Sequence, residues 1–309
     1  MRYRERRNAM LKSYTITQKL FSHHIFSAAC ICCFVTSASA QPQSTPSSEH
    51  FCASLPTYDE QSFIPFLDAM IIPGKRLSFS ELEKTLPPET MSKIIGLDEA
   101  RAEQEAKDWP NLCRYTTKNA KILSNGKRPD VVFIGDSITE IWTRGDPSLF
   151  NDRSVNRGIG GQTTSQLLLR FYQDVVSLRP RVVHIMAGTN DISPETLSAE
   201  DATTVNNIRA MIDIAKANGI RVIVASVTPS KGFYMQPNFD PSTRISAVNR
   251  ELVRLAATQR VIHVNYFPKL VDSIGDFNAA LSNDGLHPNR DGYAVMRPLL
   301  EQAIRRAKR

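Results

Sequence analysis

The residues of this 309-residue chain best suited to chemistry are a serine near its middle and a histidine close to its end. Ser137 directly follows a short apolar run, and His287 has Asp284 three residues before it. A carboxylate at that spacing can fix the tautomer of an imidazole, so that the other ring nitrogen accepts a serine proton. The three side chains therefore predict nucleophilic catalysis, with His287 as the general base and Asp284 orienting it.

Each part of this set also has a purely structural interpretation. Ser137 and Glu140 spell S-x-x-E, the pattern of a helix capping box, and this stretch alone favours neither the cap nor the nucleophile. The Asp and Asn residues around His287 are typical of a polar turn whose side chains bond their own backbone. The rest of the chain has to decide between these interpretations.

The other histidines are less suited to act as a base. His184 and His263 lie inside apolar runs that predict strands buried on both faces, where a histidine is usually a satisfied core residue. His50 lies in a polar stretch rich in Pro and Ser that has nothing apolar to bury. His287 is therefore the preferred base.

Short apolar runs alternate with segments of helical period from residue 129 to the end of the chain. Strands are expected at residues 130–134, 154–156, 182–186, 221–226 and 261–264. Between the last two strands, apolar residues recur at spacings of three and four, as on one face of a helix. This alternation predicts an α/β domain with a five-stranded parallel sheet covered on both faces. The order expected for it is the flavodoxin-like 2-1-3-4-5 of a three-layer sandwich.

Two further segments fall at strand ends in this arrangement. Residues 156–164 follow the second strand and are rich in Gly, and residues 188–191 follow the third. In the order 2-1-3-4-5 the first and third strands flank the switch point, so Ser137, Gly161 and Asn190 are expected to converge at one crevice. The backbone N–H groups of the first two and the Asn amide would form an oxyanion hole. The structural alternatives are a Gly-rich turn and an Asn-Asp turn.

Together these segments resemble the sequence blocks of the SGNH (GDSL) hydrolase superfamily. The serine block matches Gly135-Asp136-Ser137, the glycine block Gly158-Ile159-Gly160-Gly161, the Gly-x-Asn-Asp block residues 188–191 and the Asp-x-x-His block residues 284–287. The resemblance runs from about Asp108 to the C-terminus and implies the SGNH hydrolase fold. One departure is Gln162, where many relatives carry Asp, which puts the local bonding of that loop in doubt.

The resemblance implies a serine esterase that works through an acyl-enzyme. Small acyl esters or lysophospholipid-like lipids are the expected substrates, and a secreted carbohydrate O-deacetylase using the same site is the alternative. A non-catalytic carbohydrate- or surface-binding module is a rival of a different class, which the intact set of site residues disfavours. No metal or other cofactor is expected, because the chain has neither H-E-x-x-H nor paired cysteines at zinc spacing. The oligomeric state is not predicted.

Four other residues are candidate substrate contacts. Asp136 directly precedes the serine, and Arg157 could meet an anionic substrate group, with a salt bridge or loop brace as its alternative role. Phe233 and Tyr234 lie in a long, proline-containing connection after the fourth strand, and loops of such length are uncommon unless they line sites. That connection predicts either a wall of the substrate pocket or a surface loop that packs its aromatic rings onto the domain. Asp191 is interpreted as a loop brace rather than as the catalytic acid.

The first forty residues have the pattern of a secretory signal peptide. Basic residues precede an apolar stretch at 25–35, and Ala38-Ser39-Ala40 resembles a cleavage site. We therefore expect cleavage near Ala40, export to the periplasm or the outside, and no membrane span in the mature protein. The remaining regions are expected to be a disordered linker at 41–50, a partly helical N-terminal extension at 51–128 and the hydrolase domain at 129–309.

Charge and cysteine usage depend on this leader. The whole chain carries a net charge of +7, but the leader holds six Lys and Arg against Glu5. The mature protein is therefore left with about +2, too little to imply a nucleic-acid partner. Of five cysteines, only Cys52 and Cys113 lie beyond the leader. Two cysteines in an exported chain predict one disulfide, with a pair of buried free thiols as the alternative.

Overall fold

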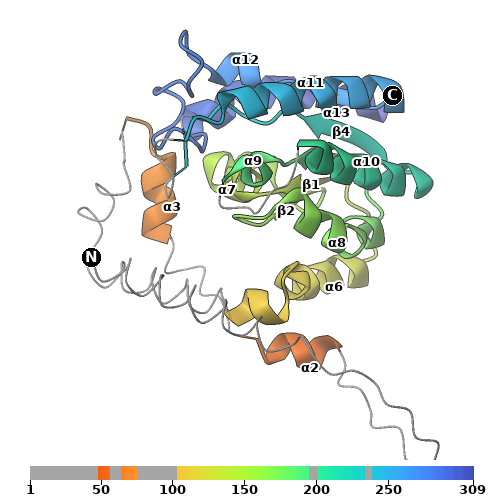
Figure 1. Ribbon diagram of the computed structural model, residues 1–309. Helices are drawn as coiled ribbons and strands as arrows, with labels where there is room; N and C mark the ends of the chain where they lie inside the picture. The colour runs from red at the N-terminus through yellow and green to blue at the C-terminus, as the bar shows by residue number, and fades with distance from the viewer. Residues whose placement is uncertain (1–47, 56–63, 75–102, 195–200, 231, 234–238) are drawn as a thin grey trace, which may run out of the picture. The chain divides into compact units, whose positions relative to one another are not determined.

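The computed structural model describes residues 48–55, 64–74, 103–194, 201–230, 232–233 and 239–309 (Figure 1). The predicted signal peptide, residues 41–47 of the expected linker and Tyr234 lie outside these ranges. Helix α2 (Ser48–Ala53) begins inside the stretch predicted as a disordered linker, so the linker prediction was too long at its end. Helix α2 carries Cys52, and a disulfide joins this residue to Cys113, as predicted.

A five-stranded parallel sheet forms the centre of the domain. Its strands are β1 (Val131–Gly135), β2 (Ser154–Gly158), β3 (Val182–Met186), β4 (Arg221–Ala225) and β5 (Ile262–Val264). They lie in the order β2-β1-β3-β4-β5, which confirms the predicted topology. Gly135 at the end of β1 is level with Gly158 on one side and Met186 on the other. The segments that leave these three strands therefore start at the same edge of the sheet.

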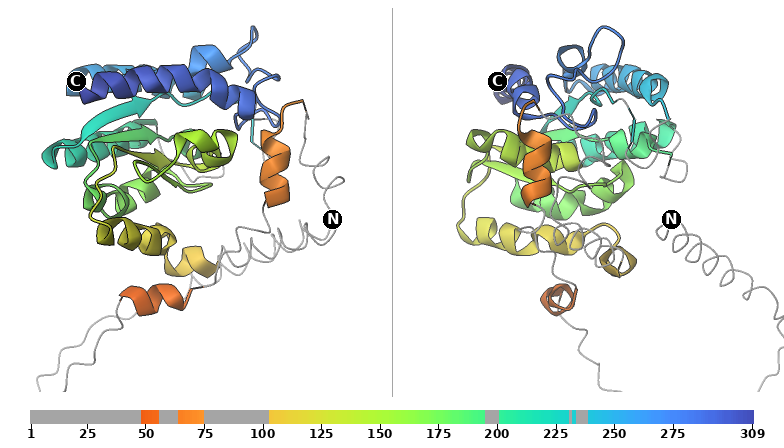
Figure 2. Two further views of the ribbon diagram at one scale, coloured as in Figure 1. Left: turned by 180° about the vertical axis from the view of Figure 1, so that it is seen from behind. Right: turned by 90° about the vertical axis from the view of Figure 1, so that its left-hand side faces the viewer.

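Helices cover both faces of this sheet (Figures 1 and 2). The α-helices after α2 are α3 (Ile64–Ile71), α6 (Thr116–Ser124), α7 (Ser137–Gly145), α8 (Thr164–Asp174), α9 (Thr189–Ile192), α10 (Asp201–Ala217), α11 (Ser242–Gln259), α12 (Phe267–Leu270) and α13 (Arg290–Lys308), and residues 103–107 are also helical. Short 3-10 helices are η2 (Leu112–Tyr115), η3 (Pro147–Leu149) and η4 (Val176–Leu178).

The core is divided in two by the sheet. Val132 and Ile134 of β1 pack with residues of α8, α10 and α11, whereas Val131 and Phe133 pack with residues of α3, α7 and α13. This division follows the two-residue period of a strand, whose successive side chains point to opposite faces. Two cores on one parallel sheet confirm the predicted three-layer α/β sandwich.

Helices α7 and α13 are joined directly, although they lie far apart in the sequence. The ring of Trp142 in α7 stacks on that of Tyr293 in α13, with centroids 5.2 Å apart. The hydroxyl of Tyr293 also donates to the carbonyl oxygen of Ile138 at 2.7 Å. Tyr293 lies near the start of α13, so this contact also holds the loop before α13 beside the start of α7.

The N-terminal extension contributes to the same core. Met70 and Ile71 at the end of α3 are buried against α7 and α13. The amide of Asn283, in the loop before α13, donates to the carbonyl oxygen of Ala69 at 3.0 Å and to that of Ile72 at 2.6 Å. None of the helices in the described ranges combines the length and the apolar composition needed to span a bilayer.

Candidate active site

Ser137 is the first residue of α7, at the turn where β1 ends. The N-cap is Asp136, which has an extended backbone and accepts a hydrogen bond from the N–H of Ile138 at 3.0 Å. The capping-box interpretation of Ser137 and Glu140 was therefore wrong: Ser137 already has a helical position, and the carboxylate of Glu140 accepts from Gly160 and Arg114. The hydroxyl of Ser137 is left for another partner.

That partner is His287. Its Nε2 lies 2.8 Å from Ser137 Oγ, and its Nδ1 lies 2.7 Å from Asp284 Oδ2. The other carboxylate oxygen of Asp284 accepts from the backbone N–H groups of Leu286 and His287, each at 2.8 Å. The carboxylate of Asp284 thus does both things that were predicted: it bonds the backbone of the polar turn, and it bonds the imidazole of His287. With Nδ1–H donating to Asp284, Nε2 is the nitrogen that can accept from the serine hydroxyl.

The glycine-rich loop after β2 runs alongside Ser137. A Cβ atom added to Gly160 would lie 3.7 Å from Ser137 Cβ, so the two residues are neighbours. Gly161 has φ +75°, a left-handed conformation that favours glycine, and its N–H donates to no acceptor in the described part of the chain. The amide of Asn190 donates to the carbonyl oxygen of Gln162 at 2.9 Å. The loop after β2 therefore contacts the start of α7 through Gly160 and α9 through Asn190.

Buried side chains hold the loop after β2 by hydrogen bonds to its residues 162–164. The carboxylate of Asp191 accepts from both the N–H and the hydroxyl of Thr164, which matches its interpretation as a loop brace, and burial raises its pKa. Gln162, the departure from the family pattern, makes its own bonds: its Oε1 accepts from Arg170 at 2.6 Å and its Nε2 donates to the carbonyl oxygen of Pro110 at 2.9 Å. Gln162 therefore provides side-chain bonds for this loop although it departs from the family pattern.

Asp136 is more deeply buried than its neighbour Ser137. Its side chain is 1 % exposed, and its Oδ2 has no hydrogen-bond partner among the described residues. Burial raises its pKa to about 7, because the low-polarity surroundings disfavour the charged form. Its contact with the start of α7 gives it a capping role, and nothing in its geometry favours the predicted substrate contact.

The remaining candidate contacts have structural partners. Arg157 is buried, its Nε donates to Asn119 Oδ1 at 2.8 Å, and its guanidinium lies 4.7 Å from the ring centroid of Tyr115. These contacts correspond to the alternative role of a loop brace. Phe233 is buried in the sheet core, with its ring centroid 6.1 Å from that of Phe239, as expected for a loop that packs its aromatic rings onto the domain.

Of the two strand histidines, His184 is a core residue as the sequence indicates, whereas His263 is only half-buried because β5 is an edge strand. His184 is fully buried, and its Nε2 lies 3.1 Å from the hydroxyl of Tyr266. Burial lowers its pKa to about 3, so it stays neutral. Burial also lowers the pKa of His263, which lies in β5 on the far side of the sheet from β2.

Sequence reasoning missed a buried ion pair behind the site. Arg170 and Asp174 of α8 are 0 % and 1 % exposed, with Nη1 and Oδ2 2.9 Å apart. Arg170 also donates to backbone carbonyls in β1 and β2, so it ties the ends of the two strands together. A signal was present, because Arg170 and Asp174 share the helical spacing of the apolar Leu167 and Phe171 and therefore occupy the buried face.

Comparison with known proteins connects this geometry to a family. A family model described as the GDSL-like lipase/acylhydrolase family matches residues 133–295, a range that includes all the strand-end segments described above. The chain belongs to this family. This assignment confirms the SGNH (GDSL) resemblance and makes the protein an ester-bond hydrolase.

Solved structures and curated relatives of the GDSL family agree with the assignment. A putative acylhydrolase from Bacteroides fragilis is 39 % identical, with a TM-score of 0.62, and the match covers 65 % of this chain and 99 % of the other. A GDSL-like lipase from Bacteroides thetaiotaomicron is 38 % identical, with a TM-score of 0.61, covering 65 % and 100 %. The platelet-activating factor acetylhydrolase IB subunit alpha1 of Pongo abelii is 32 % identical over 183 residues, 55 % of this chain and 73 % of that protein.

Proposed function

We propose that the protein is a serine esterase that hydrolyses carboxylic esters through an acyl-enzyme. Ser137 Oγ attacks the ester carbonyl carbon while His287 Nε2 takes its proton, and His287 then gives this proton to the departing alcohol. In the second half-reaction His287 removes a proton from water, which attacks the acyl-enzyme, and His287 returns this proton to Ser137 Oγ as the acyl–oxygen bond breaks and the carboxylic acid leaves. The observation that carries the proposal is the pair of hydrogen bonds at 2.8 Å and 2.7 Å that links Ser137, His287 and Asp284.

The negative oxygen of each tetrahedral intermediate is held by three donors in this proposal. They are the N–H groups of Ser137 and Gly161 and the side-chain amide of Asn190. The N-terminus of α7 adds the positive end of its dipole at the same place. Removing one donor of this kind typically raises the barrier by about 2.7–4 kcal/mol.

We propose short acyl groups, acetyl first, as the part of the substrate bound near Ser137. Curated relatives that share 32 % of the aligned residues are named acetylhydrolases, which supports a small acyl group. Phe233, one of the two aromatic residues predicted for the pocket wall, is packed in the core and so gives no support to a long acyl chain. The disulfide between Cys52 and Cys113 supports the proposed export, because such bonds persist in oxidising compartments.

A series of p-nitrophenyl esters of increasing acyl length tests both parts of this proposal. We expect the highest kcat/KM for acetate and a steady fall with longer chains. Ser137→Ala should lower kcat by at least about 10⁴-fold, since the nucleophile is lost. Ser124→Ala, at the exposed end of α6, is the matched control and should keep wild-type rates. Undiminished turnover by Ser137→Ala would rule out the mechanism.

A fluorophosphonate probe separates an enzyme from a binding module on the same scaffold. The probe should label the wild-type protein once, at Ser137, and leave Ser137→Ala unlabelled, as read by intact mass. A wild-type protein that stays unlabelled would favour the non-catalytic module. Release of acetate from an acetylated polysaccharide, compared with release from an acetylated lipid, then decides the alcohol part of the substrate.

A further inference from the structure

The side chain of Glu140 lies against the loop that follows β2. Its Oε2 accepts a hydrogen bond from the N–H of Gly160 at 2.7 Å. Gly160 is the residue directly before Gly161, the proposed oxyanion donor. Only the two soft dihedral angles of Gly160 separate its N–H from that of Gly161, so fixing the first N–H limits the directions open to the second. Glu140 therefore touches the residue that sets where Gly161 points.

The backbone of Glu140 supports the start of the same loop. A Cβ atom added to Gly158 would lie 2.2 Å from the backbone nitrogen of Glu140, so the end of β2 packs directly on α7 at this position. A Cβ on Gly160 would also lie 3.1 Å from Glu140 Oε2. Residues 158–161, which include the proposed donor Gly161, are called the donor loop below. Glu140 of α7 thus contacts the donor loop through both its backbone and its carboxylate.

Arg114 holds the other oxygen of this carboxylate. Its Nη2 lies 3.0 Å from Glu140 Oε1, and the two side chains are 16 % and 31 % exposed. A bare carboxylate beside an oxyanion site would oppose the negative charge that develops there. The guanidinium compensates this charge, so the pair can serve as a support without an electrostatic penalty.

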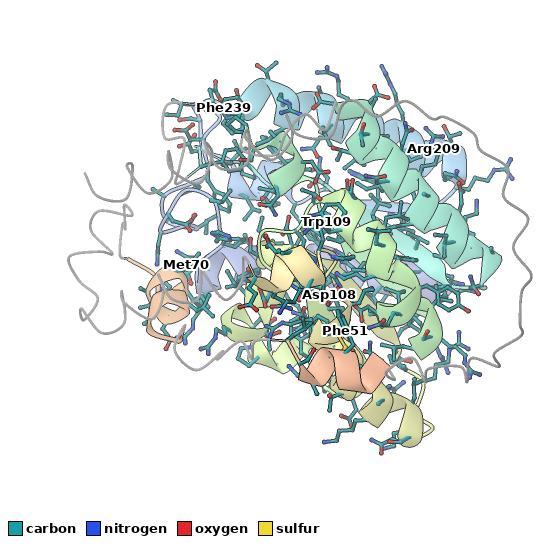
Figure 3. The ribbon with its side chains drawn as sticks, turned by 60° about the horizontal axis from the view of Figure 1, so that its bottom comes forward. Phe51, Met70, Asp108, Trp109, Arg209 and Phe239 are labelled. Atoms are coloured by element: carbon teal, nitrogen blue, oxygen red, sulfur yellow. A yellow bond between two sulfur atoms is a disulfide. The ribbon has the colours of Figure 1, made fainter. Side chains whose placement is uncertain are left out.

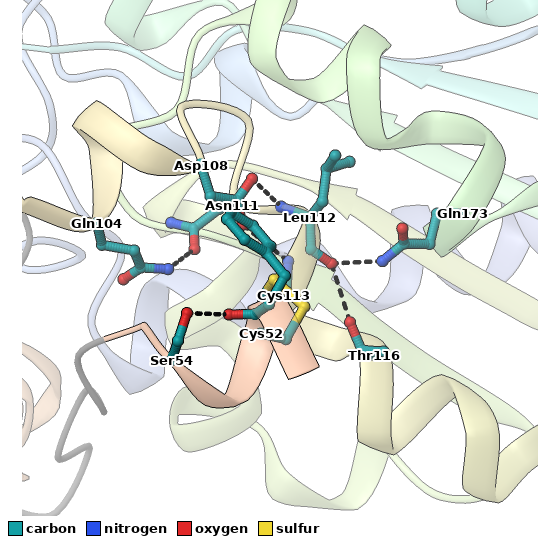
Figure 4. The surroundings of a disulfide bond; sticks show 10 residues. Cys52, Ser54, Gln104, Asp108, Asn111, Leu112, Cys113, Thr116 and Gln173 are labelled. Atoms are coloured by element: carbon teal, nitrogen blue, oxygen red, sulfur yellow. Dashed lines mark hydrogen bonds between the residues drawn. A yellow bond between two sulfur atoms is a disulfide. The ribbon is translucent and has the colours of Figure 1, made fainter. Parts of the chain in front are cut away.

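Arg114 comes from a segment with its own anchors, residues 108–115 (Figures 3 and 4). Asp108 accepts from the N–H groups of Leu112 and Cys113, each at 2.9 Å, and a disulfide ties Cys113 to Cys52. The next residue after Arg114 reaches the donor loop as well, because the hydroxyl of Tyr115 donates to the carbonyl oxygen of Gly158. The segment is therefore a fixed base for the contacts that it makes with this loop.

We infer that Glu140 is a positioning residue that fixes the Gly160–Gly161 loop for oxyanion binding, and that Arg114 of the disulfide-linked segment holds Glu140 in place. The inference rests on the proposed function, since it concerns a donor of the proposed oxyanion hole. Its effect must fall on kcat rather than on KM, because the oxyanion exists only during the reaction and not in the bound substrate.

Four variants assayed with p-nitrophenyl acetate test it. Glu140→Ala should lower kcat by about 10- to 100-fold, the range for a donor displaced by about 1 Å, with KM within about twofold of wild type. Glu140→Gln keeps an acceptor for the N–H of Gly160 and should recover most of this loss. Arg114→Ala should lower kcat by a smaller factor. The double variant Arg114→Ala/Glu140→Ala should equal Glu140→Ala alone, because Arg114 acts through Glu140.

A second ion pair on α7 provides the control. Arg144 Nη1 lies 2.9 Å from Asp68 Oδ1, and Arg144→Ala removes a salt bridge from the same helix without touching the donor loop. This variant should keep the wild-type kcat. The free energy of unfolding is measured for every variant, so that each kcat refers to folded protein. If Glu140→Ala does not fold, the comparison uses Glu140→Gln and Arg114→Ala instead.

The outcomes separate this inference from the proposed function. Wild-type kcat in folded Glu140→Ala would overturn the inference, as would a loss that appears in KM alone. Additive losses in the double variant would overturn the role given to Arg114. If Ser137→Ala also retained activity, the proposed mechanism itself would fail, whatever the Glu140 variants show.

Discussion

Asp284 Oδ2 lies 2.7 Å from His287 Nδ1, while Asp284 Oδ1 accepts two backbone N–H groups of the same turn. One carboxylate thus shapes the turn and orients the imidazole. Asp284→Asn should keep the turn, because the amide oxygen can replace Oδ1, but its NH₂ group cannot accept from Nδ1–H. We expect kcat to fall by about 10³- to 10⁴-fold with little change in thermal stability. Steady-state kinetics and calorimetry measure the two effects; a kcat close to wild type would exclude Asp284 as the orienting acid.

Asn190→Ala tests the side-chain donor of the proposed oxyanion hole. Its loss should lower kcat by about 10²- to 10³-fold and leave KM nearly unchanged. Asn207→Ala is a fitting control, because the Asn207 amide donates to Thr164 and Ser165 just beyond the same loop. If both variants lost activity equally, the effect would belong to loop support rather than to oxyanion binding.

Arg170→Met tests the buried ion pair behind the site. The variant leaves Asp174 charged and buried without its partner, so the free energy of unfolding should fall by about 3–5 kcal/mol. Arg254→Met removes an exposed pair with Glu251, whose side chains are 72 % and 46 % exposed, and should change it by less than about 1 kcal/mol. Chemical denaturation of both variants gives the two changes in the free energy of unfolding. Equal changes would show that burial does not determine how much an ion pair contributes to stability.

Asp136 predicts a pH dependence of stability. Its pKa is raised by burial to about 7, above the ordinary value of 3.8, so the folded state binds the proton more tightly than the unfolded state. Its contribution to stability is therefore full below about pH 4 and is lost as the pH rises to about 7. Asp136→Asn keeps the helix cap and removes this titration.

The measurement for Asp136 is a difference between two proteins at two pH values. Denaturation curves at pH 5 and pH 8 should show that Asp136→Asn gains stability relative to wild type on going to pH 8. Other titrating groups cancel in this difference, because both proteins share them. An offset between the two proteins that is the same at pH 5 and pH 8 would contradict the raised pKa.

The secondary structure could be predicted from the sequence because apolar runs and helical spacings are local signals. These signals predicted the five strands, whereas their order was taken from the flavodoxin-like arrangement. The observed order of the strands places Ser137, Gly161 and Asn190 after β1, β2 and β3, as expected from that arrangement. The partner of Glu140 was out of reach, since S-x-x-E is a local pattern and Gly160 lies twenty residues further along. Similarly, no short-range pattern indicates that Arg170 bonds backbone carbonyls of two different strands. Distant contacts were predicted only where the residue types themselves indicated a partner, as for Ser137 with His287 and Cys52 with Cys113.

The stacked pair of Trp142 and Tyr293 has a consequence for when the protein can act. Ser137 and His287 are separated by 150 residues, and α13 begins three residues after His287. Under the proposed mechanism a growing or partly folded chain therefore carries an inert serine hydroxyl until α13 docks on α7. Turnover of an ester would then report directly when α13 has docked on α7.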